Sequence, residues 1–151
     1  MNIGRFLASA AAVWLVRVAL NSTFYTRVIG QQSQQIAASH PGVFREVIPG
    51  FILTDLIFAV AFTYLFVKVG AALGGGRMAG VKLGLLIAVL SPVIGTLYQY
   101  FGVTYLSVGL VTAESVFQMI AHAIEGAVAG AMYKAEVAPK IEAVKNFARA
   151  E

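Results

Sequence analysis

Three ionisable residues lie within long apolar stretches of the sequence: Arg17, Asp55 and Glu125. A charge near the centre of a membrane-spanning helix costs about 2.5–3.5 kcal/mol on insertion scales, so each of the three requires a partner. A guanidinium stays charged at any relevant pH, and Arg17 therefore needs a carboxylate or an aqueous cavity. At a rise of about 1.5 Å per residue, both acids lie within roughly 6 Å of Arg17 in depth, and we expect Arg17 to pair with one of them.

A polar stripe follows the last of these apolar stretches. It consists of Glu114, Gln118, His122 and Glu125, whose spacing places them within an arc of roughly 80° on a helix. An acid and an imidazole facing lipid would be unfavourable, so we expect the stripe to face the interior of a helix bundle. Gln118 or His122 is then expected to meet the remaining donors of Arg17.

This intramembrane set is compatible with three roles. In the simplest, an Arg17 ion pair orients the helices and does nothing else. In the second, Glu125, His122 and Arg17 relay a proton or bind a ligand, as acids and histidines do in pumps and transporters. In the third, His122 ligates a haem or a chlorophyll-type pigment, because its small neighbours leave room for a macrocycle. A second axial histidine on a facing helix is missing, since His40 lies outside the apolar stretches.

The composition indicates the class of protein. Of 151 residues, 59% are hydrophobic and 12% are charged, and the mean hydropathy is +0.80. Soluble domains carry about 25% charged and about 45–50% apolar residues, so the composition is that of a membrane protein. The chain has no cysteine, which excludes disulfides, thiolate metal sites and a cysteine nucleophile. No catalytic triad, metal-ligand cluster or phosphate loop can be assembled from the residues, so we predict neither an enzyme nor a cofactor.

Four apolar stretches are long enough to cross a hydrocarbon core about 30 Å thick, which takes about 20 helical residues. They cover residues 6–25, 51–67, 83–101 and 112–133. Backbone groups in lipid must be hydrogen-bonded within their own segment, so these stretches are expected to be helices. The predicted fold is an all-α, four-helix transmembrane bundle formed by residues 1–134.

The basic residues predict the orientation of the bundle. With the N-terminus in the cytoplasm, eight lysines and arginines lie on the inner side, Arg27 and Arg45 lie outside, and Arg17 lies within a span. This bias follows the positive-inside rule and predicts that both termini are cytoplasmic. The alternative for the first stretch is a signal peptide, but Arg17 interrupts it before a cleavage site of small residues.

Two connections carry signals of their own. Residues 30–48 include a glutamine-rich run before Pro41 and Gly42. We expect a solvated outer loop with a short surface helix that ends at the Pro-Gly turn; a lid or docking loop is the alternative. The inner residues 70–80 contain three consecutive glycines without the strand or the Gly-Lys-Ser/Thr ending of a phosphate loop, and they predict a flexible link.

Small residues and one proline predict how the helices pack. The small-residue surfaces are Gly126 with Gly130, Gly80 with Gly84, and Ala8 to Ala12, and their default role is close packing within a bundle or a dimer. Pro92 is expected to kink the third span and to free a carbonyl that Ser91 or a neighbouring polar side chain can satisfy.

The tail, residues 135–151, has helical periodicity. Its apolar residues Val137, Ile141, Val144 and Phe147 recur at helical spacing, with the basic residues on other faces. This pattern predicts a short cytoplasmic amphipathic helix on the anionic inner leaflet. The basic charge lies along the inner face as topology requires, so we expect no nucleic-acid partner.

Several short segments resemble a known group of proteins. They are Met1-Asn2-Ile3 with Arg5-Phe6-Leu7, Gly84-Leu85-Leu86-Ile87, and Ile124-Glu125-Gly126 followed by Ala129-Gly130 and Tyr133. With these segments the chain resembles short four-span bacterial inner-membrane proteins of unassigned function. The resemblance implies a four-helix architecture with an acid in the last helix, and it implies no reaction. The chain differs from small multidrug transporters, whose essential acid lies in the first helix, where this chain has Arg17.

These features predict a multi-pass protein of the bacterial inner membrane that serves as a small accessory or interaction subunit. Its expected partners are the lipid bilayer and either copies of itself or a larger membrane complex. The alternative is a proton-coupled small-molecule carrier or channel that uses Arg17, His122 and Glu125. Haem or pigment binding through His122 is a further alternative.

Overall fold

The computed structural model describes residues 2–43 and 48–133, and within them every regular element is helical, with no strand. The elements are α1 (Ile3–Thr23), its π-helical continuation η1 (Phe24–Val28), α2 (Gly30–Ser39), α3 (Ile48–Val69), α4 (Gly76–Ala88), the π-helical turn η2 (Val89–Val93), α5 (Ile94–Gly102) and α6 (Val108–Met132). The all-α prediction is confirmed for this part of the chain. Arg45 and the predicted tail helix over residues 135–151 lie outside the described residues.

Three helical segments are long and apolar enough to cross a membrane: Ile3–Val28, Ile48–Val69 and Gly76–Gly102. They contain the first three predicted spans. The fourth predicted span corresponds to α6, which has 25 residues and thus a length of about 38 Å at 1.5 Å per residue. The polar side chains of the stripe lower the mean hydropathy of α6. For this reason α6 is not one of the three segments that are apolar enough to cross a membrane.

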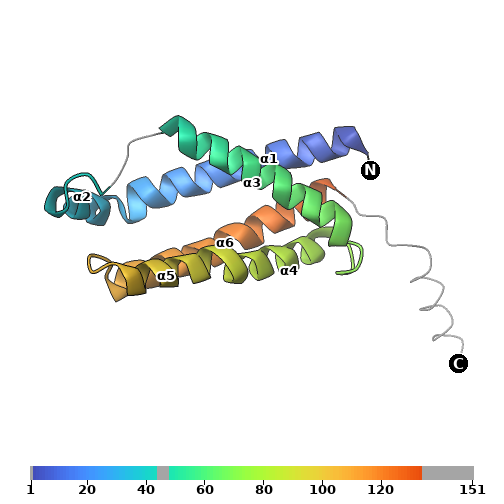
Figure 1. Cartoon of the computed structure of the whole chain (residues 1–151). Coiled ribbons are helices and arrows are strands. Elements are labelled where there is room, and N and C mark those ends of the chain that lie inside the picture. The colour runs from blue at the N-terminus through green and yellow to red at the C-terminus, as the bar shows by residue number, and fades with distance from the viewer. Residues whose placement is uncertain (1, 44–47, 134–151) are drawn as a thin grey trace, which may run out of the picture.

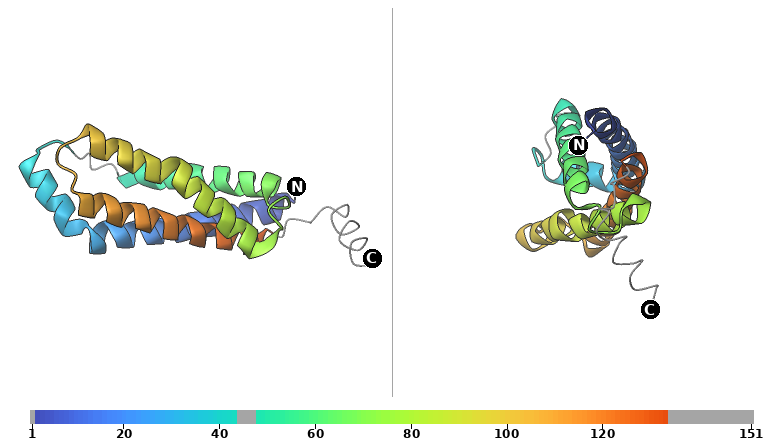
Figure 2. Two further views of the ribbon diagram at one scale, coloured as in Figure 1. Left: turned by 90° about the horizontal axis from the view of Figure 1, so that it is seen from below. Right: turned by 90° about the vertical axis from the view of Figure 1, so that its right-hand side faces the viewer.

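The helices form two layers (Figure 1). In one layer α1 and α3 lie side by side, and in the other α4, η2 and α5 form one bent rod that packs along α6. The N-terminus, the turn between α3 and α4, and the end of α6 lie at one end of the molecule, whereas α2 and the connection between α5 and α6 lie at the other (Figure 2). We call these the N-end and the α2-end.

Local signals in the sequence explain where several helices begin. The side chain of Asn2 accepts from the backbone N–H of Arg5 at 3.0 Å, and that of Ser107 accepts from Leu110 at 3.2 Å, so both residues cap a helix N-terminus. Gly74, Gly75 and Gly76 have φ angles of 100°, 69° and 67°, a region that L residues rarely adopt. They turn the chain at the N-end, and the link there spans residues 70–75, five residues shorter than expected.

Glycines bring α4 and α6 into backbone contact. A Cβ atom on Gly80 would overlap the carbonyl oxygen of Gly126, and one on Gly84 would overlap that of His122. A Cβ on Gly130 would likewise overlap the carbonyl oxygen of Gly76. Two of the three predicted small-residue surfaces therefore face each other inside this chain.

Pro92 interrupts the rod formed by α4 and α5. It lies in the π-helical turn η2, where proline has no backbone N–H to donate. The hydroxyl of Thr96 donates to the carbonyl oxygen of Pro92 at 2.9 Å. The predicted interruption is therefore present, but the hydroxyl of Thr96 bonds to the carbonyl of Pro92 itself and not to the carbonyl one turn earlier that the proline leaves free.

Two apolar clusters lie at different levels of the bundle. The N-end cluster contains Val13, Ala59, Phe62, Phe66, Ala79, Leu83 and Ala129, so residues of α1, α3, α4 and α6 meet there. The α2-end cluster contains Phe24, Ile29 and Leu110, with Phe117 packed against it. Arg17, Asp55 and Glu125 lie between these two levels.

Candidate functional site

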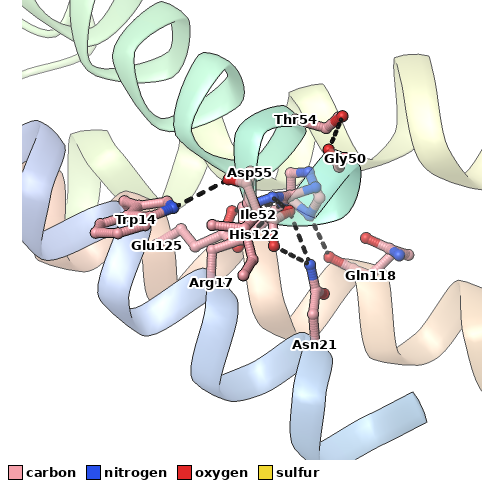
Figure 3. A network of polar contacts seen from close by, with 10 residues as sticks. All are labelled: Trp14, Arg17, Asn21, Gly50, Ile52, Thr54, Asp55, Gln118, His122 and Glu125. Carbon is pink, nitrogen blue, oxygen red and sulfur yellow. Dashed lines mark hydrogen bonds and ion pairs between the residues drawn. The ribbon is translucent and has the colours of Figure 1, made fainter. Parts of the chain in front are cut away.

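Arg17 joins three helices through two acids (Figure 3). Its Nε donates to Oδ1 of Asp55 on α3 at 2.8 Å, and its Nη1 donates to the two carboxylate oxygens of Glu125 on α6 at 3.1 and 3.3 Å. The expected contact with one acid is present, and the second acid binds as well. We call Arg17, Asp55 and Glu125 the ion network.

Asn21 also hydrogen-bonds to Asp55, and the sequence analysis did not predict Asn21 as a site residue. Its Nδ2 donates to Oδ1 and Oδ2 of Asp55 at 3.1 and 3.3 Å. Asn21 follows Arg17 by four residues, which places both side chains on one face of α1. That spacing was the signal that could have identified Asn21.

The expectation that Gln118 or His122 meets Arg17 is wrong. Nδ1 of His122 lies 2.8 Å from the backbone carbonyl oxygen of Gln118, one turn earlier in α6. Since a carbonyl only accepts, Nδ1 carries a hydrogen and donates. The histidine is thus bonded to its own helix and not to the guanidinium.

Phe58 covers the guanidinium and is the second residue that the sequence reasoning missed. The guanidinium carbon of Arg17 lies 3.8 Å from the centre of the Phe58 ring, a cation–π geometry. The same ring meets His122 at a centroid distance of 5.1 Å and an interplanar angle of 81°. Phe58 follows Asp55 by three residues, so the two lie on one face of α3.

Glu114 lies apart from the ion network. It accepts a hydrogen bond from the hydroxyl of Tyr25 at 2.7 Å, near the α2-end. Glu114 precedes Glu125 by eleven residues, which is about 16 Å along a helix. The predicted stripe therefore has two parts: Glu114, which is bonded to Tyr25 near the α2-end, and the inner part around Glu125.

The inner part of the stripe is buried. Glu125 is 0% exposed and His122 is 1% exposed, whereas the side chains of Arg17 and Asp55, which reach Glu125 from α1 and α3, are each 13% exposed. Gln118 is 7% exposed, and its Oε1 is one of three buried side-chain oxygens without a hydrogen-bond partner in the described part of the chain. Gly126 and Gly130, the other predicted site residues, lie on the α4 side of α6 and pack against backbone.

Apolar residues lie on both sides of the ion network along the bundle. One turn toward the N-end, Val13, Ala59 and Ala129 are each 0% exposed. Toward the α2-end, the rings of Phe24 and Phe117 stack with centroids 4.0 Å apart and an interplanar angle of 4°. The geometry is that of a largely buried ion cluster connecting α1, α3 and α6.

The surroundings of His122 do not fit a haem or another macrocycle. Phe58 lies against the ring, and the backbone carbonyl of His122 packs against Gly84. A macrocycle bound through the remaining ring nitrogen would require these groups to move apart. The described part of the chain also contains no group of three or more His, Asp or Glu residues placed to hold a metal ion.

Replacing Asn21 with alanine is expected to destabilise the bundle by about 1.5–3 kcal/mol, because a hydrogen bond to a carboxylate is lost in a partly buried site. Thermal unfolding in detergent, followed by circular dichroism, measures the change. Ser22→Ala is the matched control, since Ser22 is exposed on the next position of α1. Equal melting temperatures for the two variants would show that Asn21 does not support Asp55.

The ion network, Asn21, Phe58 and His122 thus form one connected cluster built from α1, α3 and α6. Its residues come from parts of the sequence that are far apart. Comparisons with protein-family models, curated proteins and solved structures found no match for this chain.

Proposed function

We propose that the chain crosses the bacterial inner membrane four times, with both termini in the cytoplasm, as the four-span proteins that it resembles would. The three long apolar helices and the length of α6 support this proposal. The placement of the N-terminus and the end of α6 at one end of the molecule agrees with an even number of crossings (Figure 2).

Single cysteines test this topology, because the chain has none of its own. A cysteine at Ser39, at the α2-end, is expected to react with an impermeant maleimide added outside intact cells. A cysteine at Ala72, in the turn at the N-end, is expected to react only after the membrane is opened. The reverse pattern of labelling would overturn the proposed orientation.

Within this topology, we propose that the protein is an accessory or interaction subunit of a membrane assembly rather than an enzyme. The observation that carries this proposal is the position of the largely buried ion network between the two apolar clusters. A conducting or catalytic site needs access for water or substrate, whereas an ion cluster that fixes helix positions does not. The ion network is suited to holding α1, α3 and α6 in one arrangement that a partner can bind.

The surface of α1 is the proposed contact with the partner. The glycine surfaces of α4 and α6 are occupied by each other. Of the predicted small-residue surfaces, Ala8 and Ala11 on α1 remain exposed. Small side chains let a helix from another subunit approach closely, and that subunit is a second copy of this chain or part of a larger complex.

Photocrosslinking in native membranes tests the partner and the surface together. A photoreactive amino acid at Ala11 is expected to give a discrete adduct of higher mass, identifiable by mass spectrometry. The same amino acid at Ile57, exposed on α3, is the control for contact with lipid and is expected to give none. Absence of an Ala11 adduct, together with purification as a lone monomer in mild detergent, would count against an accessory role.

A second candidate function is a proton-coupled carrier or channel that uses Arg17, His122 and Glu125. Two buried hydroxyls without partners favour it, Ser9 on α1 and Thr63 on α3, which lie beyond the N-end side of the ion network. Polar groups would then extend past the apolar layer at Val13 and Ala59. pH-dependent flux in proteoliposomes that disappears in Glu125→Gln would support this function over the accessory role.

A further inference from the structure

The ion network has one more acid than it has bases. Arg17 is its cation, and Asp55 and Glu125 are its two carboxyl groups. α4, which packs behind α6, brings Arg77 and Lys82, and both are exposed. With both carboxyls ionised, the network would carry a net charge of −1 in a buried site, where an unbalanced charge is costly.

Protonation of His122 does not provide the missing positive charge. In the described part of the chain no carboxylate oxygen lies within 4.0 Å of its ring nitrogens. Its ring instead lies against Phe58, the same ring that the Arg17 guanidinium covers. An imidazolium there would be a second cation next to the first, without a carboxylate of its own.

Two acceptor atoms of α6 lack a hydrogen-bond donor among the described residues. Oε1 of Gln118 is buried without a partner, and Figure 3 shows this oxygen on the side of His122. Nδ1 of His122 donates to a carbonyl, so Nε2 of the neutral ring is an acceptor, and none of the described residues donates to it. One additional proton within the ion network would supply the missing positive charge.

We propose that the ion network binds one proton, carried by Glu125, so that the cluster of Arg17, Asp55 and protonated Glu125 is neutral. The proton adds to a carboxylate oxygen, and no bond between heavy atoms changes. Glu125 is the carrier because its two oxygens share a single donor at 3.1 and 3.3 Å. Asp55 accepts from Arg17 at 2.8 Å and also from Asn21, so it is the better stabilised anion.

This proton site goes beyond the proposed accessory role and does not depend on it. The apolar clusters flank the proton site on both sides along the bundle. Loss of the proton leaves an excess negative charge where α6 meets α1 and α3. The contact between these helices therefore weakens when the proton is removed.

Infrared spectroscopy of the full-length protein in lipid nanodiscs tests the proposal. The expected signal at neutral pH is the C=O stretching band of a protonated carboxylic acid. Carboxyl-¹³C glutamate should shift this band, whereas carboxyl-¹³C aspartate, which labels only Asp55, should not. This isotope experiment needs no mutation, so it holds even if a variant fails to fold.

Three variants test the charge balance. Glu125→Gln should lose the band. Asp55→Asn should also lose it although Glu125 is retained, because Arg17 and ionised Glu125 then balance each other. Glu114→Gln is the matched control and should keep the band.

Three results would overturn the proposal. The first is the absence of a carboxylic-acid band at neutral pH, which is also the outcome if Na⁺ or K⁺ supplies the missing charge. The second is a band that shifts with labelled aspartate. The third is a band that persists unchanged in Asp55→Asn.

Discussion

Replacing Arg17 with leucine is expected to remove most of the folded protein from membranes. Arg17 supplies hydrogen bonds to both Asp55 and Glu125, and without it two acids remain in a buried site with no cation. Breaking a buried ion pair by removal of one partner costs about 3–5 kcal/mol, a large part of the 5–15 kcal/mol that stabilises an ordinary domain. The amount of monodisperse protein recovered in mild detergent measures the loss.

Removing the acids together with the arginine should restore part of this yield. The triple variant Arg17→Leu, Asp55→Asn, Glu125→Gln leaves no unpaired charge and is expected to recover better than Arg17→Leu alone. Arg27→Leu is the matched control, because Arg27 is exposed in η1. A triple variant as poorly folded as the single one would indicate that Arg17 acts through some property other than its ion pairs.

The second large effect is expected for Gly126→Ala. A Cβ at this position would overlap the carbonyl oxygen of Gly80, so α4 and α6 must separate or shift. Overpacking typically costs about 1–3 kcal/mol of folding stability. Here the added methyl group meets a backbone carbonyl, which cannot change rotamer to make room as a side chain can. Because Gly126 follows Glu125, the shift also disturbs the ion network.

Gly95→Ala separates this packing effect from the general effect of adding a methyl group to a helix. Nothing lies within 4 Å of a Cβ built on Gly95, and alanine favours a helix more than glycine does. Thermal unfolding should show a clear decrease in melting temperature for Gly126→Ala and little change or a small increase for Gly95→Ala. Equal behaviour of the two variants would contradict backbone contact between α4 and α6.

Hydropathy predicted the helical class and the approximate helix positions because long apolar runs leave few alternatives. It failed at the start of α4, where residues 76–82 are helical although the third span was expected to begin at 83. Glycine disfavours a helix in isolation, and a run containing Gly76 and Gly80 therefore suggested a link. Packing of these glycines against α6 is a tertiary contact that a local pattern does not reveal.

The sequence could predict those residues of the candidate site whose placement in lipid is energetically costly. Arg17, Asp55 and Glu125 were expected near one another because each is an ionisable group in an apolar stretch. Phe58 carries no such cost, so nothing in the sequence distinguished it, whereas Asn21 could have been identified only by its position one turn after Arg17. That Arg17 binds both acids depends on the relative rotation of three helices, which the sequence pattern leaves open.

The central claim is that Arg17 joins α1 to both α3 and α6 inside the bilayer. Solid-state NMR of the protein in lipid bilayers tests it directly through dipolar coupling between ¹⁵N-labelled arginine side chains and ¹³C-labelled carboxyl groups. Asp55 is the only aspartate in the chain, so aspartate labelling reports on one residue, and Glu125→Gln identifies the glutamate signal. We expect strong couplings of an arginine side chain to Asp55 and to Glu125, both lost in Arg17→Lys. An uncoupled Asp55 carboxyl in the wild-type protein would contradict the ion network.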